Sequence, residues 1–201
     1  MEFNGVLAVI VRRAARRLGS LFYGDRLNRN FIRSSSGAAA VEFGLVAAPF
    51  LVLLIAILET ALVFFAGRVL DETTEQASRY ILTGQAQLSN MTQAQFANYV
   101  CQHTFALFNC NNFMINVQTY NSFATANTAA PVLNFNAQGQ VTNQWTYSPG
   151  NPGDIVVVQV MYEWPVIGLL GFDIANIGSN QRLLVSTAVF KNEPFPGGAG
   201  P

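Results

Sequence analysis

The sequence has few charged residues and few of the side chains that usually carry catalysis. Only 11% of its 201 residues are charged, and it has a single histidine, His103. One histidine cannot form a metal-binding cluster, so we expect it at the surface or near the end of a helix. No serine lies in a G-x-S-x-G motif, and there is no phosphate-binding loop. These absences argue against an enzyme, and we expect no metal and no cofactor.

The acidic residues of the C-terminal part are scattered along the chain. Asp154, Glu163 and Asp173 lie in or near segments with strand-like patterns. They could form a carboxylate pair, but solvated strand ends explain them more simply. No basic patch occurs beyond the first 37 residues, so we do not expect a nucleic-acid partner.

Cysteine is also scarce, with only Cys101 and Cys110 present. An even number of cysteines in an oxidising compartment favours a disulfide, which would here close a small loop. Two buried thiols are the alternative. The C-x8-C spacing, without a nearby histidine or third cysteine, is poor for a metal site.

The formal net charge of zero conceals an asymmetry along the chain. Residues 1–37 carry seven arginines and two acids, a balance of +5, whereas the rest carries four bases and nine acids, a balance of −5. Basic residues accumulate on the cytoplasmic side of a membrane span. We therefore predict that the N-terminus stays on the cytoplasmic side of a membrane and that the C-terminal two-thirds of the chain lies outside.

A long apolar run predicts the membrane span at residues 43–67. The run has no charge from Phe43 to Leu58 and contains Pro49. About 20 residues suffice to cross the hydrocarbon core. Proline removes a backbone hydrogen bond and clashes with the preceding turn, so we expect a kink near Pro49.

Glu59 is the one charged residue within this predicted span. Its carboxylate could reach the outer headgroups, which is the simpler interpretation. It could instead contact Arg68 or a basic group of a neighbouring subunit, because charges at membrane depth require partners.

The start of the apolar run has the features of a processing site. Cleavage after Gly37 would leave Ala38 as a new N-terminus with an ammonium group, and Glu42 would become the fifth residue, followed by Phe43. Glu42 of one subunit could then pair with the amine of another, which would neutralise both charges and fix the register between the two helices. The alternative is an uncut anchor whose Glu42 lies among the headgroups.

These residues resemble a known family. Gly37 before the cut, with Glu42 and Phe43 at the fifth and sixth positions after it, is similar to the processing site of Tad-type (Flp) pilins and pseudopilins. Residues 36–87 and the closing segment STAVFKNEPF resemble the TadE-like family in particular. The resemblance implies a minor pseudopilin of the tight-adherence pilus, a single-pass protein of the bacterial inner membrane with a cytoplasmic N-terminus and a periplasmic C-terminal domain. It also implies three kinds of partner: a prepilin peptidase, an inner-membrane assembly platform driven by an ATPase, and other pilin subunits.

Periodicity predicts the elements that follow the apolar run. A long helix over 38–83 should end at Gly84, and Thr92 and Gln95 form a capping-box pair at the start of a second helix. Three strands are predicted from alternating or β-branched residues. The second helix is predicted at 92–108. The three strands are predicted at 113–117, 154–164 and 182–191.

The region 118–152 is polar and carries a few aromatic residues. It could be an exposed binding loop, or it could lie on the sheet with its aromatic side chains buried. The aromatic residues in question are Phe123, Phe135, Trp145 and Tyr147.

We thus expect an α+β, pilin-like fold: a long N-terminal transmembrane helix followed by a small antiparallel sheet. The expected parts are a leader that is removed, the long helix, a periplasmic domain and a flexible tail, at 1–37, 38–83, 84–196 and 197–201. The expected function is that of a pilus subunit in assembly and surface adherence. The alternative is an uncleaved, membrane-anchored binding module or assembly factor that does not enter the fibre.

Overall fold

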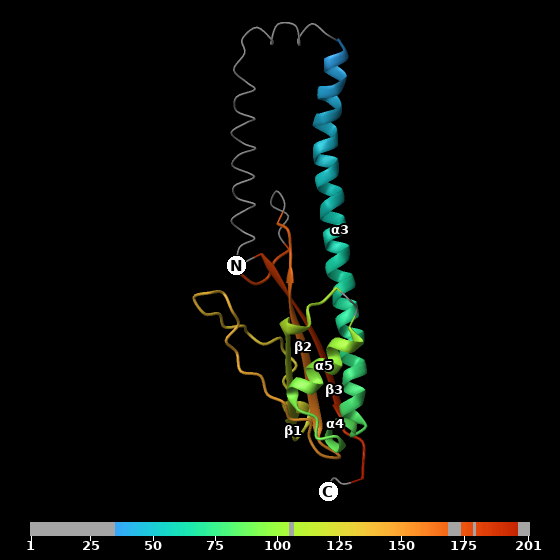
Figure 1. Ribbon diagram of the computed structural model, residues 1–201, viewed down its shortest axis with the longest axis vertical. Coiled ribbons are helices and arrows are strands. Elements are labelled where there is room, and N and C mark those ends of the chain that lie inside the picture. The colour runs from blue at the N-terminus through green and yellow to red at the C-terminus, as the bar shows by residue number, and fades with distance from the viewer. Residues whose placement is uncertain (1–34, 105–106, 169–173, 179, 197–201) are drawn as a thin grey trace. The chain divides into compact units, whose positions relative to one another are not determined.

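The computed structural model (Figure 1) describes most of the chain, in two compact units, Met1–Leu53 and Leu54–Pro201. Most of the predicted leader, the predicted tail and Asp173 lie outside the described residues. The described residues are 35–104, 107–168, 174–178 and 180–196.

Helix α3 (Ser35–Leu82) is the long helix that the sequence predicts. Its first half is apolar on all sides, and its second half alternates buried and exposed positions. Arg79 in the last turn favours the helix end, because its charge offsets the negative end of the helix dipole. The chain then passes through Gly84, whose φ of 78° is left-handed, into the short helix α4 (Gln85–Leu88).

The second half of α3 presents one buried stripe to the C-terminal domain. Its members recur every three or four residues, which places them on one face of the helix. They are Val63, Ala66, Leu70, Thr73, Thr74, Ala77 and Ile81, all buried.

Helix α5 (Gln93–His103) begins with the predicted capping box. The Thr92 side chain accepts a hydrogen bond from the Gln95 amide, and the Gln95 side chain accepts one from the Thr92 amide. The helix ends earlier than the predicted 108, so that boundary was wrong. Thr104 has an extended backbone, with φ −92° and ψ 142°. The chain must leave the helix there, because it turns back to bring Cys110 to Cys101.

Three antiparallel strands form one sheet in the order β1-β2-β3: Phe113–Tyr120, Ile155–Pro165 and Gln181–Lys191. The register pairs Val117 with Val158, and Val158 with Ala188. Strand β1 extends beyond the predicted 117. The architecture is the predicted α+β arrangement of a long apolar helix followed by a small antiparallel sheet.

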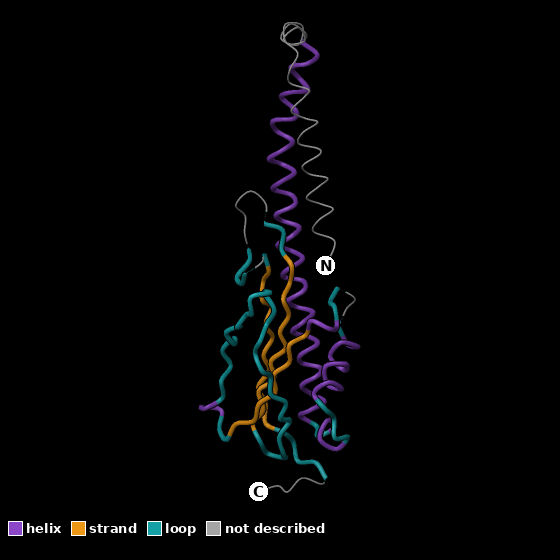
Figure 2. Tube along the Cα trace, turned by 60° about the vertical axis from the view of Figure 1, so that its left-hand side comes forward, coloured by secondary structure: helices purple, strands orange, loops and turns teal. Residues whose placement is uncertain are grey.

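Both faces of the sheet contribute buried side chains. Alternation places Ile115, Val156 and Val160 in the core that includes the α3 stripe and α5. Met161 and Val157 point to the opposite face and are also buried. Figure 2 shows helices on one side of the strands and loops on the other, so the sheet is the middle of three layers.

Candidate functional site

The N-terminal half of α3 exposes large apolar side chains on every side. Phe43 is 75% exposed, and Leu51 and Leu58 are exposed as well. A soluble protein would bury such a surface, whereas lipid accommodates it. Among the described residues, one helix, Gly37–Leu82, is long and apolar enough to cross a membrane. It is compatible with a single membrane anchor.

The predicted processing residues lie in the first turns of α3. Ala38 and Glu42 are exposed, and Gly37 is half-buried. The structure gives the Glu42 carboxylate no hydrogen bond or ion pair with another described residue. Glu42 and Phe43 are thus available for contacts with another subunit, and their pairing role stays a prediction.

Pro49 lies inside α3, which continues as a helix on both sides of it. The missing amide therefore does not end the helix. A bend at this position stays a prediction.

Glu59 connects α3 to the C-terminal domain. It lies one helical turn before the buried Val63, and one of its carboxylate oxygens accepts a hydrogen bond from the Ile167 amide in the β2–β3 connection. Arg68 does not contact it: the Arg68 guanidinium lies 3.9 Å from the Asp71 carboxylate, and both side chains are exposed. Glu59 and Arg68 therefore have separate partners within the chain.

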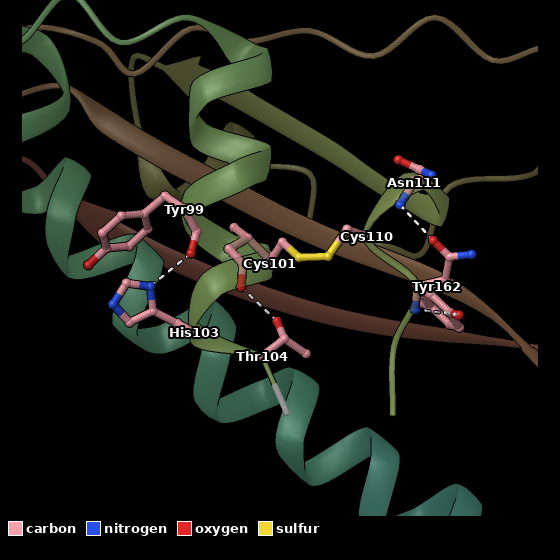
Figure 3. Close-up of a disulfide and its surroundings, with 9 residues drawn as sticks. Tyr99, Cys101, His103, Thr104, Cys110, Asn111 and Tyr162 are labelled. Atoms are coloured by element: carbon pink, nitrogen blue, oxygen red, sulfur yellow. Dashed lines mark hydrogen bonds between the residues drawn. A yellow bond between two sulfur atoms is a disulfide. The ribbon is translucent and has the colours of Figure 1, made fainter. Parts of the chain in front are cut away.

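The two cysteines are joined in a disulfide between the end of α5 and the short helix η1 (Cys110–Asn112), shown in Figure 3. Their Cα atoms are 5.4 Å apart. The loop that the disulfide closes is also attached to the sheet, because the Asn109 amide donates to the Tyr162 hydroxyl over 3.1 Å. The disulfide thus anchors the segment that leads into β1.

His103 occupies the last turn of α5. Its Nδ1 lies 2.8 Å from the Tyr99 carbonyl, and its ring lies 4.2 Å from the Tyr99 ring. In the part of the chain that the structure describes, no three His, Cys, Asp or Glu side chains gather at a potential metal site. His103 therefore has local contacts typical of a helix end.

Of the three scattered acids, Asp173 lies outside the described residues, and the two described ones, Asp154 and Glu163, do not form a pair. Asp154 precedes β2, where its carboxylate accepts the Asn151 amide over 2.7 Å and stabilises a turn. Glu163 lies near the other end of β2, about 30 Å away at 3.3 Å per residue. Burial raises the pKa of Glu163, and among the described residues its Oε1 has no hydrogen-bond partner.

The polar segment between β1 and β2 has two parts: one lies over the outer face of the sheet, and the other packs against the core. The Gln159 side chain donates to the Ala129 carbonyl over 2.9 Å, which holds the loop on the second face of the sheet. Phe123 and Phe135 are exposed there, at 58% and 40%. Tyr147 instead packs against the core, with its ring 5.5 Å from that of Phe96.

The return of this segment also covers the free edge of β1. The Val117 amide donates to the Thr146 carbonyl, and the Ser148 amide donates to the Val117 carbonyl. Burial, followed by a smaller effect of Tyr80, raises the pKa of Tyr147 to about 12. The polar region is therefore exposed in one part and packed on the core in another, and binding by the exposed part stays a prediction.

Sequence reasoning missed a group of contacts at the end of β3. The Asn192 side chain, buried, donates to the carbonyls of Pro149 and Asn151, and the Glu193 amide donates to the Leu82 carbonyl over 2.9 Å. The ring of Phe195 lies over Gly84. These contacts fasten the end of the chain to the end of α3.

A polar residue next to a strand end is common, so the sequence alone does not mark Asn192 for this role. The sequence likewise does not identify Ile167 as the partner of Glu59, because the two residues are 108 positions apart. The one available indication was the motif KNEPF, of which Asn192, Glu193 and Phe195 make these contacts.

Comparison with known proteins bears on the helix alone. The searches of curated proteins and of solved structures found no match. A family model described as TadE-like protein matches residues 37–79. This segment begins at the predicted processing site, includes Glu59 and covers most of α3. Over this helix the chain is therefore similar to TadE-like proteins.

Proposed function

We propose that the protein is a minor pseudopilin that is processed after Gly37 and then takes part in assembly of a Tad-type pilus and in surface adherence. The observation that supports this most directly is the family match, which starts at Gly37 and follows the exposed apolar helix. A structural role agrees with the non-enzymatic nature of this family.

In this proposal the chain inserts as a precursor with its arginine-rich leader in the cytoplasm. A prepilin peptidase removes residues 1–37, and the inner-membrane platform takes up the shortened chain. Because the domain contacts α3 at Glu59 and Val63, we place the lipid-crossing part close to 38–58, in place of the 43–67 expected from the apolar run alone. That length matches the ~20 residues needed to cross the hydrocarbon core.

Glu42 would fix the register between subunits. Its carboxylate is unpaired among described residues, and cleavage would supply a cation at Ala38 of a neighbouring chain. Pairing would remove the cost of holding either charge in a poorly solvated place.

The mass of the N-terminus tests processing. In cells with the pilus system, we expect a mature chain that starts at Ala38. Gly37→Leu should remain at precursor size, because a bulky side chain would occupy the position before the cut. Gly44→Ala is the matched control, since a Cβ there meets no atom within 4 Å, and it should be processed normally. An intact leader on the wild-type chain would contradict the proposal and favour an uncleaved anchor or assembly factor.

Pilus formation tests the role of Glu42. Glu42→Val and Glu42→Gln should both be processed yet fail to restore pili in a deletion strain, because both lack the charge. Glu72→Gln removes an exposed charge elsewhere on α3 and should restore them. Normal pili with Glu42→Gln would disprove the charge pairing, but would not contradict the proposed cleavage after Gly37.

A further inference from the structure

The contact between Glu59 and the β2–β3 connection lies where a membrane would end. Counting ~20 residues from Ala38 places the outer edge of the hydrocarbon core near Leu58. A carboxylate and a backbone amide are both costly at that depth without partners. Glu59 and Ile167 satisfy one another there, because the amide donates to the carboxylate.

The side chains around this contact are apolar and exposed. Leu58 is 62% exposed, Phe64 70% and Ile167 65%. Val166, the residue before Ile167, is buried in the core cluster that also contains Val63. The connection is therefore fixed to α3 by Val166, while its next residue, Ile167, projects outward.

The directions of these side chains distinguish lipid from a single protein partner. Leu62 and Phe64 are both exposed. Residues that are two positions apart in a helix differ by about 200° around its axis. They consequently point to nearly opposite sides of α3. One docked helix would cover one stripe, whereas a lipid interface surrounds the helix and contacts all exposed sides at once.

We propose that the C-terminal domain docks on the outer surface of the membrane, with Ile167 and the apolar residues Leu58, Leu62 and Phe64 in the lipid interface. Glu59 is the positioning residue that holds the β2–β3 connection at that depth. This inference rests on the proposed membrane anchoring by α3. It adds a second, domain-borne lipid contact, which would restrict how the domain tilts on its anchor.

Lipid-attached quenchers test the docking on the full-length chain in phospholipid vesicles. An environment-sensitive fluorophore is placed on Ile167→Cys, while Cys101 and Cys110 stay unlabelled because they are disulfide-bonded. The control is Val132→Cys, which is 81% exposed in the polar segment. We expect quenching by headgroup-level spin labels at position 167 and none at position 132. Equal quenching of the probes at positions 167 and 132 would overturn the docking.

A probe on Leu51→Cys separates the docking from the anchoring on which it rests. Leu51 is an exposed residue within the proposed span, so deep spin labels should quench it. Quenching at 51 without quenching at 167 refutes the docking alone. No quenching at 51 refutes the anchoring, and the docking with it.

Variants at Glu59 test its positioning role. Glu59→Gln keeps an oxygen that accepts the Ile167 amide, so quenching at position 167 should persist. Glu59→Leu lacks an acceptor, and quenching should fall to the Val132 control value. Unchanged quenching in Glu59→Leu would refute the role of Glu59.

A second copy of the chain is the competing occupant. The measurement is therefore repeated in nanodiscs that hold one chain each. Persistent quenching at Ile167 supports lipid contact. Shielding of the probe without lipid quenching, seen only in crowded vesicles, would show contact with another copy and overturn the proposal.

Discussion

Gly84 is the residue where backbone conformation and long-range packing coincide. Its φ is +78°, and a Cβ there would overlap the Phe195 ring. Only glycine combines a left-handed backbone with so close an approach. The position ends α3 and also receives the C-terminal segment.

Gly84→Ala should therefore destabilise the C-terminal domain by at least about 1–2 kcal/mol, from the left-handed backbone alone. Displacement of Phe195 would add to this. Chemical unfolding in detergent, followed by tryptophan fluorescence, measures the change. Gly67→Ala is the control, because a Cβ there has no neighbour within 4 Å and alanine favours helix by up to about 1 kcal/mol. Equal unfolding midpoints for wild type and Gly84→Ala would contradict the packing of Phe195.

Tyr147 makes stability depend on pH in the alkaline range. Burial, with a smaller effect of Tyr80, raises the pKa of Tyr147 from 10.0 to about 12. Between those values the unfolded chain releases the phenol proton while the folded chain keeps it, so stability is retained below pH 10 and falls as pH rises toward 12. Tyr147→Phe should lessen that fall and leave stability near pH 8 little changed. Parallel pH profiles for the two proteins would exclude Tyr147 as the cause.

At the scale of elements, the disulfide determines where α5 ends and how β1 begins. It connects Cys101, in the last turns of the helix, to Cys110, three residues before the strand. The loop between them also packs through Phe108, whose ring lies 4.9 Å from that of Tyr162. The link therefore fixes the helix and the sheet at one end of the domain.

Replacing both cysteines by serine should lower the free energy of unfolding by about 2–3 kcal/mol, the chain-entropy value for closing a loop of this length. Urea unfolding of the oxidised wild type, the reduced wild type and the double variant measures it. Reduction should reproduce the effect of the double variant. In exported protein without reductant, alkylation should add no mass at either cysteine, and two added groups would contradict the disulfide.

Elements could be predicted wherever a local pattern determines them. The apolar run gave α3, the Thr92 and Gln95 pair gave the start of α5, and β-branched residues gave β2. The end of α5 could not be predicted from its periodicity, because the apolar spacing continues past His103 while the disulfide draws the chain away. Helix α4 has only four residues and no periodic pattern to reveal it.

At the scale of the whole molecule, charge orients the chain. The balance of +5 before residue 38 and −5 after it predicts a cytoplasmic leader and an exported domain. Alkaline phosphatase fused after Pro201 should be active, because that enzyme needs export to fold. Replacing Arg26, Arg29 and Arg33 by glutamate should reduce that activity, while Glu72→Gln should not. Full activity in the triple variant would show that charge does not set the orientation.

The layered arrangement lay beyond prediction from the sequence. Polar residues in 118–152 suggested either an exposed or a covering loop, and local composition is the same for both. The choice depends on pairings such as Gln159 with the Ala129 carbonyl, between residues 30 positions apart. Likewise, the long run of apolar residues predicted the membrane anchor. The contact between Glu59 and Ile167, which joins α3 to the C-terminal domain, could not be predicted from it.

The fastening of the chain end to α3 has a consequence for how the protein is made. The buried stripe of α3 emerges from the ribosome well before β3 and the Glu193 amide that donates to the Leu82 carbonyl. During synthesis the apolar stripe stays uncovered until β3 has emerged and the Glu193 amide can donate to the Leu82 carbonyl. A chain that stopped before Asn192 would keep α3 but lack these contacts, and we expect proteases to degrade it.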